Sequence, residues 1–507
     1  MQKNILEYLD KTALEFCDKM AFNDGDISVT FKELKQNTEA IGSGLLQLGV
    51  MNQPIVVFLS NKCECVNAFL GIVSSGNFYC QIDFTMPIER INSILKILMP
   101  AGIITRREYK QKVELFQTQC DVFFIEELEK TKIQDLQLEQ IRYRMCDLDP
   151  VYVLFTSGST GVPKGVVITH RGVIDYTDWF GETFLIDETH IFGNQVPLHF
   201  DLSIQDIYCA LKYGCSVYFI PQRFFLFPQN LIGYLNEKRI NTIIWVPSVL
   251  CTVVNLKGFE VITPKFLKKI LFAGEVMPNK QLNVWRREVP DALYVNLFGP
   301  TEITNICAYY IVDREFNDDA PLPIGGPCNN IRLYVLNENN ELVKEGESGE
   351  LCVFGTCLAL GYFNNFQKTK ESFIQNPLNS FYEERLYRTG DIVKYNDRGE
   401  LLYLCRKDFQ IKHMGHRIEL GEIEVVFGGM THIENCACLY DDKTSRIVMF
   451  YMGSEMEAKD LVVYLKKKIP EYMIPNVFIH CKDFPYNANG KIDRKRLREK
   501  FYEGGGR

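Results

Sequence analysis

The sequence lacks the features that mark membrane, secreted and zinc-binding proteins. No apolar run reaches the ~18 residues that a membrane-spanning helix needs, and no basic stretch followed by an apolar one opens the chain as a secretory signal would. No Cys-x-x-Cys occurs, and no Cys and His residues stand at zinc spacing. We therefore expect a cytoplasmic protein without membrane insertion, whose 17 cysteines are buried or surface thiols.

An excess of positive charge is also absent. The 507 residues include 56 Lys and Arg against 64 Asp and Glu, which gives a formal net charge of −8. Such a chain is not typical of a nucleic-acid-binding protein, so we expect no nucleic-acid partner. With 46% hydrophobic and 24% charged residues, the composition is that of a folded globular protein with room for more than one domain.

Strand and helix patterns alternate along the first part of the chain. Helical spacing covers 1–24 and 67–75, and a short strand leads into a helix over 28–48. Apolar runs that suit buried strands cover 54–59, 77–82, 101–105, 151–155, 215–220, 242–246, 269–272 and 293–297. This alternation predicts an α/β fold with parallel-type sheets covered by helices on both faces.

The pattern changes after residue 330. Turn residues separate short strands at 331–336, 349–354, 391–395 and 401–404, which predicts antiparallel hairpins or a small β-barrel-like subdomain. A small α+β unit is predicted beyond them, from helices at 420–427 and 458–468 and strands at 434–440 and 446–452. We place the boundary between an N-terminal core, 1–405, and a C-terminal domain, 406–507.

The strongest motif is the run Thr-Ser-Gly-Ser-Thr-Gly-Val-Pro-Lys-Gly at 156–165, directly after a predicted buried strand. Glycines let the backbone approach an anion closely, and successive amides and hydroxyls form an anion cradle. Lys164 adds a positive charge suited to phosphate. Because Pro163 precedes this lysine, the motif is not the loop of the common nucleoside triphosphatases. We interpret it as a phosphate-binding loop rather than a flexible linker.

This loop and six further motifs stand in the order found in adenylate-forming enzymes. The six are Asn-Leu-Phe-Gly-Pro-Thr-Glu at 296–302, Gly-Glu-Leu at 349–351, Tyr-Arg-Thr-Gly-Asp at 387–391, Arg-Lys-Asp-Phe-Gln-Ile-Lys at 406–412, Gly-His-Arg-Ile-Glu-Leu-Gly-Glu-Ile-Glu at 415–424 and Asn-Ala-Asn-Gly-Lys-Ile-Asp at 487–493. Over nearly its whole length the chain resembles acyl-CoA synthetases, luciferases and nonribosomal-peptide adenylation domains.

The resemblance implies ATP and Mg²⁺ as cofactors. It implies that Phe298 stacks on adenine, that Thr301 contacts the α-phosphate, and that Glu302 helps to hold Mg²⁺. Asp391 binds the ribose hydroxyls in the family, with Arg406 assisting. The full set expected around the nucleotide is Thr156, Ser157, Gly158, Ser159, Thr160, Gly161, Lys164, Gly274, Glu275, Asn296, Leu297, Phe298, Gly299, Asp391 and Arg406.

Lys491 is the third expected catalytic residue, beside Thr301 and Glu302. In the family this lysine swings into the large domain, where it stabilises the attacking carboxylate and the charge at the α-phosphate. Without the Asn-Gly-Lys context, a lysine in this basic run would more simply lie on a solvated helix face. Asp408 matches the hinge about which the mobile C-terminal domain rotates between adenylation and thiol transfer, and Cys405 stands where glycine is usual near it.

The element Phe-Asp-x-Ser at 200–203 indicates the class of acid. In amino-acid-activating members its carboxylate, here Asp201, pairs with the substrate α-ammonium, whereas a helix cap is the simpler alternative. Motif alignment adds a pocket lined by Leu202, Gln205, Trp245, Leu271, Ala273, Leu297, Asn305 and Ile306. Trp245 would limit its depth, and the amides of Gln205 and Asn305 could hydrogen-bond a polar substrate side chain.

The same stretch is especially similar to D-alanine–carrier protein ligases, from which Ala273 and Asn305 depart. We therefore predict a ligase that activates D-alanine or a small or polar amino acid as aminoacyl-AMP. It then passes the aminoacyl group to the phosphopantetheine thiol of a carrier protein. The carrier is expected in trans and the enzyme as a monomer. An acyl- or aryl-CoA ligase and a non-catalytic binding module are the alternatives. The module is disfavoured because the charged residues of the motifs are all present, namely Lys164, Glu302, Asp391 and Lys491.

Overall fold

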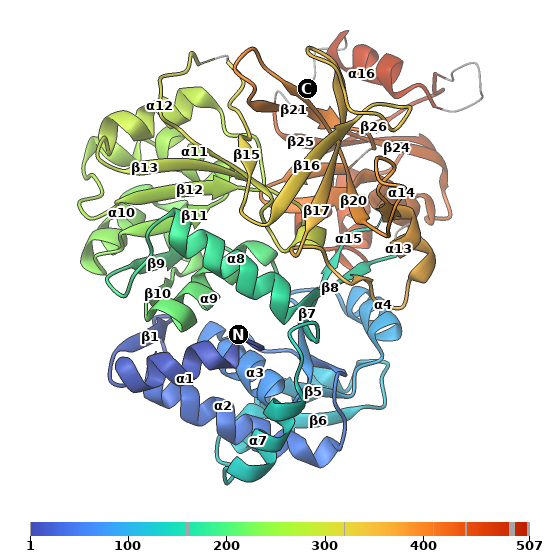
Figure 1. The fold of residues 1–507 in the computed structure, drawn as a ribbon. Coiled ribbons are helices and arrows are strands. Elements are labelled where there is room, and N and C mark those ends of the chain that lie inside the picture. Colours follow the sequence, from blue (N-terminus) through green and yellow to red (C-terminus); the bar gives the residue numbers. More distant parts are fainter. Residues whose placement is uncertain are drawn as a thin grey trace.

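The computed structural model of the protein describes residues 2–158, 162–318, 320–408, 410–441, 444–485 and 492–503. Two large sheets, helices and a smaller antiparallel sheet form most of the molecule, and the C-terminal strands and helices lie beside that smaller sheet (Figure 1). Within the described ranges, no helix combines the length and the apolar character needed to cross a membrane.

The first sheet has seven strands in the order β18-β8-β7-β4-β3-β5-β6. Their bounds are β3 Pro54–Val57, β4 Phe78–Gln81, β5 Gly102–Thr105, β6 Asp121–Phe124, β7 Pro150–Thr156, β8 Lys164–Thr169 and β18 Gly361–Tyr362. The strands from β7 to β6 run parallel, as predicted, whereas β8 returns antiparallel to β7. The phosphate loop therefore joins two neighbouring antiparallel strands.

The second sheet has nine strands in the order β15-β14-β13-β12-β11-β9-β10-β1-β2. Their bounds are β1 Met20–Asn23, β2 Ser28–Thr30, β9 Ile191–Asn194, β10 Ser216–Phe219, β11 Thr242–Trp245, β12 Lys269–Ala273, β13 Leu293–Phe298, β14 Ala308–Ile311 and β15 Gly326–Pro327. The helix expected over 1–24 ends at Glu15, because Met20–Asn23 instead pairs with β10 and β2. Tertiary pairing here overrides the helical spacing of the apolar residues.

Sixteen helices are described. They are α1 Leu6–Glu15, α2 Phe31–Leu45, α3 Lys62–Ser74, α4 Ile88–Leu98, α5 Lys110–Val113, α6 Ile125–Leu128, α7 Asp135–Arg144, α8 His170–Thr183, α9 Ile204–Tyr213, α10 Pro228–Glu237, α11 Pro247–Asn255, α12 Asn279–Glu288, α13 Phe366–Ser372, α14 Leu420–Gly428, α15 Ala458–Lys466 and α16 Arg494–Glu503. The largest apolar cluster joins the facing sides of both sheets to α1, α2, α3, α8 and α9. Separate clusters cover the outer face of each sheet. The resulting layers explain why both faces of the parallel strands are apolar.

The antiparallel prediction after residue 330 is confirmed. A five-stranded antiparallel sheet contains β16 Ile331–Leu336, β17 Ser348–Gly355, β19 Phe373–Gln375, β20 Arg385–Tyr395 and β21 Leu401–Arg406. Cys405 pairs with Ile392, and the register of β20 with β21 shifts directly beside this pair, between Ile392 and Val393.

The described residues of the C-terminal unit form a hairpin, a three-stranded sheet and three helices. The hairpin is β22 Gln410–His413 with β23 His416–Glu419, and the sheet is β24 Ile433–Asp441, β25 Arg446–Gly453 and β26 Val477–His480. Helices α14 and α15 share an apolar cluster with these strands, centred on Ile423, Phe427, Met449 and Leu461. This core is separate from those of the two large sheets.

Candidate functional site

The predicted site residues meet where strands of both large sheets end. The phosphate loop follows β7, and Thr301 and Glu302 follow β13 in a 3-10 turn. Asp201 begins the turn before α9, and Asp391 lies in β20 of the antiparallel sheet. Carboxyl ends of parallel strands are where α/β folds commonly bind ligands.

Glu302 is a fully buried and ionised carboxylate. Its Oε1 accepts a hydrogen bond from the Tyr362 hydroxyl at 2.8 Å, and its Oε2 accepts one from the Arg417 guanidinium at 2.5 Å. Burial opposes its ionisation, but the charges of Arg417 and Lys164 lower the pKa of Glu302 to about 2. A charged carboxylate in a water-poor site is a suitable ligand for a hard cation.

Asp201 lies beside Glu302, but its pKa is shifted in the opposite direction. Burial raises the pKa of Asp201, the hydrogen bond with Thr301 opposes that shift, and the negative charge of Glu302 adds to it. The structure thus brings Asp201, Thr301 and Glu302 together. A partly desolvated carboxylate of this kind gains from a cationic partner.

The described part of the phosphate loop is in contact with the C-terminal unit. The Ser157 hydroxyl donates to the backbone carbonyl of Arg417 at 2.7 Å, and the Gly158 N–H donates to the Glu422 carboxylate at 3.2 Å. The Lys164 ammonium lies 3.4 Å from the Glu419 carboxylate. The hydroxyl of Thr156 is buried without a hydrogen-bond partner among the described residues, so it remains available to a ligand. Ser159, Thr160 and Gly161 lie outside the described residues.

A lysine lies against Phe298, the aromatic residue expected to contact the nucleotide base. Phe298 is buried next to Tyr403, with their ring centroids 6.1 Å apart, and the Lys412 ammonium lies 4.9 Å from the Phe298 ring centroid. Burial lowers the pKa of Lys412, which the Asp391 carboxylate counteracts. In this arrangement, therefore, a hairpin lysine lies on the ring expected to stack on adenine.

Arg406 joins the expected ribose and hinge residues. Its guanidinium lies 3.1 Å from Asp391 Oδ1 and contacts both carboxylate oxygens of Asp408, at 2.9 and 2.7 Å. These bidentate contacts lower the pKa of Asp408 against the effect of its burial. Lys491, like residues 489–490 before it, lies outside the described residues.

The other predicted nucleotide residues lie around the same loops. Glu275 accepts N–H hydrogen bonds from Ser248 and Gly415, both at 2.8 Å, so it links the start of α11 to the hairpin. Gly274 precedes it with φ +93°, and Gly299 lies against the backbone of Asn305. Leu297 lies in β13, and the Asn296 amide donates to the carbonyl of Pro323 at 2.8 Å.

The two side-chain amides predicted to contact the substrate, those of Gln205 and Asn305, hydrogen-bond to each other. Asn305 donates to Gln205 Oε1 at 2.7 Å and to the Tyr176 hydroxyl at 3.2 Å, and this hydroxyl donates to the same Gln205 oxygen at 3.2 Å. Gln205 also donates to the carbonyl of Leu202. Because that carbonyl can only accept, it sets the orientation of both amides.

The structure groups the remaining pocket residues but separates Trp245 from them. Leu202, Leu271, Ala273, Leu297 and Ile306 share the core between the sheets. Trp245 lies in the outer cluster with α10–α12, and its indole N–H donates to the carbonyl of Gly193 at 2.8 Å.

The motifs alone do not assign roles to the charged residues of the C-terminal hairpin and of the first turn of α14. These residues contact the site: Arg417 contacts Glu302, Lys412 contacts Phe298, Glu419 contacts Lys164 and Glu422 contacts Gly158. The available signal was charge within an apolar stretch, Arg-Ile-Glu-Leu-Gly-Glu-Ile-Glu at 417–424, because buried charges need partners.

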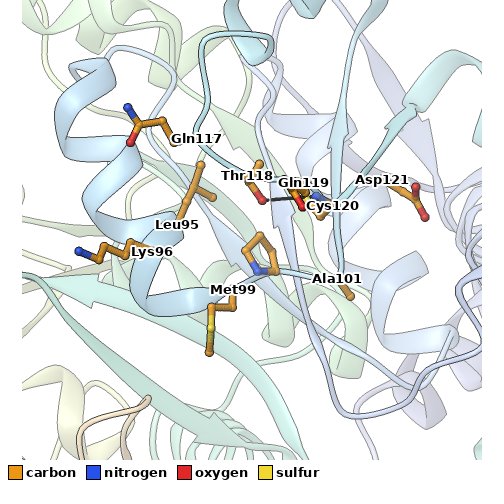
Figure 2. A pocket seen from close by; sticks show the side chains of 10 residues that line it. Leu95, Lys96, Met99, Ala101, Gln117, Thr118, Gln119, Cys120 and Asp121 are labelled. Atoms are coloured by element: carbon orange, nitrogen blue, oxygen red, sulfur yellow. Dashed lines mark hydrogen bonds between the residues drawn. The ribbon is translucent and has the colours of Figure 1, made fainter.

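A surface pocket lies elsewhere, between the end of α4 and the segment leading into β6. Figure 2 shows Lys96, Met99, Gln117 and Asp121 around it, with the Thr118 hydroxyl 3.4 Å from the Cys120 sulfur. Its lining residues differ from those predicted for the site.

Comparisons of the sequence and of the structure with known proteins agree on one family. A profile of AMP-binding enzymes matches residues 9–363. The D-alanine–D-alanyl carrier protein ligase of Bacillus cytotoxicus is 31% identical over 511 residues, covering 97% of this chain and 98% of that protein. Tyrocidine synthase 1 of Brevibacillus parabrevis is 32% identical, with 98% of this chain matched to 45% of that protein. A Vibrio cholerae adenylation domain in complex with glycyl-adenosine-5'-phosphate has the same fold, with a TM-score of 0.85 at 20% identity over 99% of this chain and 98% of that one.

Proposed function

The chain belongs to the family of AMP-binding enzymes and is an adenylate-forming ligase, and we propose that it loads an amino acid onto a carrier protein in two half-reactions. In the first, the amino-acid carboxylate attacks the α-phosphorus of ATP, the bond to the β-phosphate oxygen breaks, and pyrophosphate leaves. In the second, a phosphopantetheine thiolate attacks the aminoacyl carbonyl and AMP leaves.

The half-buried Asp201 carboxylate is the observation that carries the choice of an amino acid. It lies beside Thr301 and Glu302, and burial raises its pKa. A fatty or aromatic acid would bring no cation to it, whereas an α-ammonium group would favour its ionised form. The similarity to a D-alanine–D-alanyl carrier protein ligase over almost the whole chain supports the same choice.

The nucleotide would lie between Phe298 and Asp391, with Arg406 holding the latter. Thr156, Ser157, Gly158 and Lys164 would hold the phosphates that leave, and the unpartnered Thr156 hydroxyl fits this role. These residues would position the phosphates and neutralise their charge, which is most of what phosphoryl transfer requires.

Glu302 would hold Mg²⁺ with help from the nucleotide phosphates, and its ionised state fits a hard cation. When bound, the metal would neutralise charge on the phosphate oxygens. The Arg417 guanidinium bonds this carboxylate, so it would compete with a metal for Glu302.

For the substrate we propose D-alanine or a small or polar amino acid. The pocket amides Gln205 and Asn305 bond each other and Tyr176, so they form a rigid polar wall. Amides without hydrogen-bond partners would reject substrate side chains that cannot hydrogen-bond to them. Because these amides already hydrogen-bond to each other and to Tyr176, they exclude substrate side chains mainly by size.

We further propose that residues 406–507 move as one domain about Asp408 relative to 1–405, and that Lys491 enters the site in the first half-reaction. The carrier is a separate protein, and the enzyme works as a monomer in the cytoplasm. The free state of all 17 cysteines, every one of which lies within the described ranges, supports a reducing compartment.

ATP–pyrophosphate exchange over a panel of D- and L-amino acids tests the proposal. We expect exchange with D-alanine or with another small or polar amino acid. Exchange supported only by fatty or aromatic acids would identify an acyl- or aryl-CoA ligase instead. Failure of every acid, with ATP bound, would indicate a non-catalytic module.

A further inference from the structure

A lysine, a histidine and an aspartate form a hydrogen-bonded chain at the amino-terminal edge of the nine-stranded sheet. Nζ of Lys269 lies 2.6 Å from Nε2 of His190, and Nδ1 of His190 lies 2.8 Å from Oδ1 of Asp187. Lys269 is the first residue of β12, and His190 directly precedes β9 (Figure 1). Because the candidate site follows the carboxyl ends of the strands, the two groups of residues lie at opposite ends of the sheet.

One asparagine, Asn241, fixes the backbone on both sides of this contact. Its main-chain carbonyl accepts a hydrogen bond from the Lys269 N–H at 3.1 Å. Its side chain accepts one from the Ile191 N–H at 2.9 Å and donates one to the carbonyl of Thr189 at 3.0 Å. The residues before and after His190 and the start of β12 are therefore bonded to the same residue, so the approach of the lysine to the imidazole is built into the sheet.

The Asp187 carboxylate orients the imidazole. Since a lysine side chain donates hydrogen bonds, Nε2 of His190 is the acceptor, and Nδ1 carries the proton that it donates to Asp187. His190 is buried, and this burial lowers its pKa; the charge of Lys269 adds to the shift and Asp187 opposes it. The imidazole is therefore neutral at neutral pH, and its Nε2 can accept a proton.

Lys269 is half-buried, with charges of both signs around it. Burial lowers the pKa of Lys269; the carboxylate of Asp187 opposes this shift, Lys268 adds to it and Cys215 opposes it. A lowered pKa leaves more of the amine neutral, and the neutral amine is the nucleophile. A nucleophile within hydrogen-bond reach of a base that a third group orients is the arrangement that activates nucleophilic side chains.

We propose that Lys269 is an acylation site at which His190 acts as the general base. The acyl donor is a mixed carboxylic–phosphoric anhydride, a class that includes acetyl phosphate. It also includes the aminoacyl-AMP of this enzyme, and this second source rests on the proposed function. The Lys269 nitrogen attacks the carbonyl carbon, the C–N bond forms, the C–O bond to the phosphate breaks, and phosphate or AMP leaves. The proton lost by the nitrogen passes to Nε2 of His190 and from there to solvent, and an uncharged amide remains.

Acetylation by acetyl phosphate tests the site without any adenylation. Fragment-ion mass spectrometry would give the initial rate at each lysine. Lys268 is the exposed neighbour, and the half-buried Lys212 forms an ion pair with Asp178, so both are internal controls. We expect Lys269 to react about tenfold faster than either, because a positioned base assists only this lysine. An equal or lower rate at Lys269 would overturn the proposal.

His190→Gln removes the base but keeps a side-chain oxygen that can accept a hydrogen bond from Lys269. We expect the Lys269 rate to fall about tenfold, with the rates at Lys268 and Lys212 unchanged. His480→Gln is the matched control, since Nε2 of His480 lies 2.8 Å from the carbonyl of Gly453. An unchanged Lys269 rate in His190→Gln, or an equal loss in His480→Gln, would contradict the role of His190.

Folding of His190→Gln is checked by its melting temperature and by ATP–pyrophosphate exchange, which should stay at the wild-type level because the candidate site lies at the other end of the strands. If this variant does not fold, Asp187→Asn replaces it. That variant removes the orienting carboxylate, and we expect it to slow acetylation of Lys269 in the same direction. Wild-type acetylation in Asp187→Asn would then overturn the proposal.

ATP, Mg²⁺ and the amino acid that supports exchange provide the second donor. We expect the aminoacyl group on Lys269 of the wild type, and about tenfold less of it in His190→Gln. Exchange without any aminoacylated Lys269 would overturn the aminoacyl-AMP source. Absence of exchange with every amino acid would overturn the proposed function, and the acetyl phosphate comparison would still decide whether Lys269 is an acylation site.

Discussion

Asp201 and Glu302 lie side by side with opposite pKa shifts. The pKa of Asp201 is raised by burial, whereas the nearby Arg417 and Lys164 overcome the burial of Glu302 and lower its pKa to about 2. Neighbouring carboxylates with diverging pKa values usually have different roles. Here the raised pKa of Asp201 suits a carboxylate that pairs with a cationic substrate, and the lowered pKa of Glu302 suits a carboxylate that stays ionised.

The substitution Asp201→Asn should impair amino-acid use. We expect at least a thirtyfold loss of kcat/KM for the amino acid in pyrophosphate exchange, because truncating one side of a buried charge pair costs about 2–5 kcal/mol. ATP binding, measured by calorimetry, should stay unchanged and serves as the control. Wild-type exchange in this variant would contradict the pairing of Asp201 with the α-ammonium.

The substitution Lys491→Ala should act on the first half-reaction. A positioned cation at the α-phosphate contributes on the order of 10²-fold or more, so we expect exchange to fall by about that factor. Transfer from supplied aminoacyl-AMP to pantetheine should change little. Adenylation at a near wild-type rate would show that this lysine does not have the proposed role.

The β22–β23 hairpin is the element that completes this arrangement of the site. It places Lys412 on Phe298 and Arg417 on Glu302, and its tip bonds Glu275 through the Gly415 N–H. Gly415 has φ +80°, and an added Cβ would lie 2.7 Å from a methyl group of Val246. Both conditions require glycine at this turn.

Gly415→Ala should therefore displace the β22–β23 hairpin from its contacts with Val246 and Glu275. We expect aminoacyl transfer to fall about tenfold, because overpacking and left-handed strain cost about 1–3 kcal/mol. Pyrophosphate exchange should remain. Gly399→Ala is the matched control, since it has φ +73° with no atom within 4 Å of its added Cβ. Equal effects of the two variants on transfer would indicate backbone strain alone.

At the scale of the whole molecule, buried neutral histidines link stability to pH. Burial lowers the pKa of His170 and of His416 to about 3 each. In the unfolded chain their pKa is ~6.5, so between pH ~6.5 and ~3 the unfolded state binds protons that the folded state does not. Stability should consequently fall as pH is lowered through this window.

His170→Asn should reduce this dependence. Each buried histidine contributes up to ~1.4 kcal/mol per pH unit within the window. The melting temperature of the wild type should fall more steeply than that of the variant between pH 6.5 and 5. The exposed His432→Asn variant is the control, and it should follow the wild type. Parallel curves for His170→Asn and the wild type would show that His170 is not the linked group.

The amino-acid sequence by itself determined the class of fold, most of the parallel strands and the set of motifs. These features depend on local patterns: apolar runs between turns, and polar residues at fixed spacing after strands. The strands predicted at 54–59, 242–246 and 293–297 are present, with the bounds Pro54–Val57, Thr242–Trp245 and Leu293–Phe298. The helix over 1–24 was predicted too long, because the pairing of β1 with the distant β10 is not local.

Only the tertiary structure decided which face of a strand lies in the site and which charges meet there. Trp245 lies in the outer cluster while Leu271 and Leu297 lie between the sheets. Where both faces of a parallel strand are buried, the apolar pattern does not distinguish them. The contacts of Glu419 and Glu422 with the phosphate loop join residues 255 and 264 positions apart. Such contacts depend on how two separately formed cores dock, which no local pattern records.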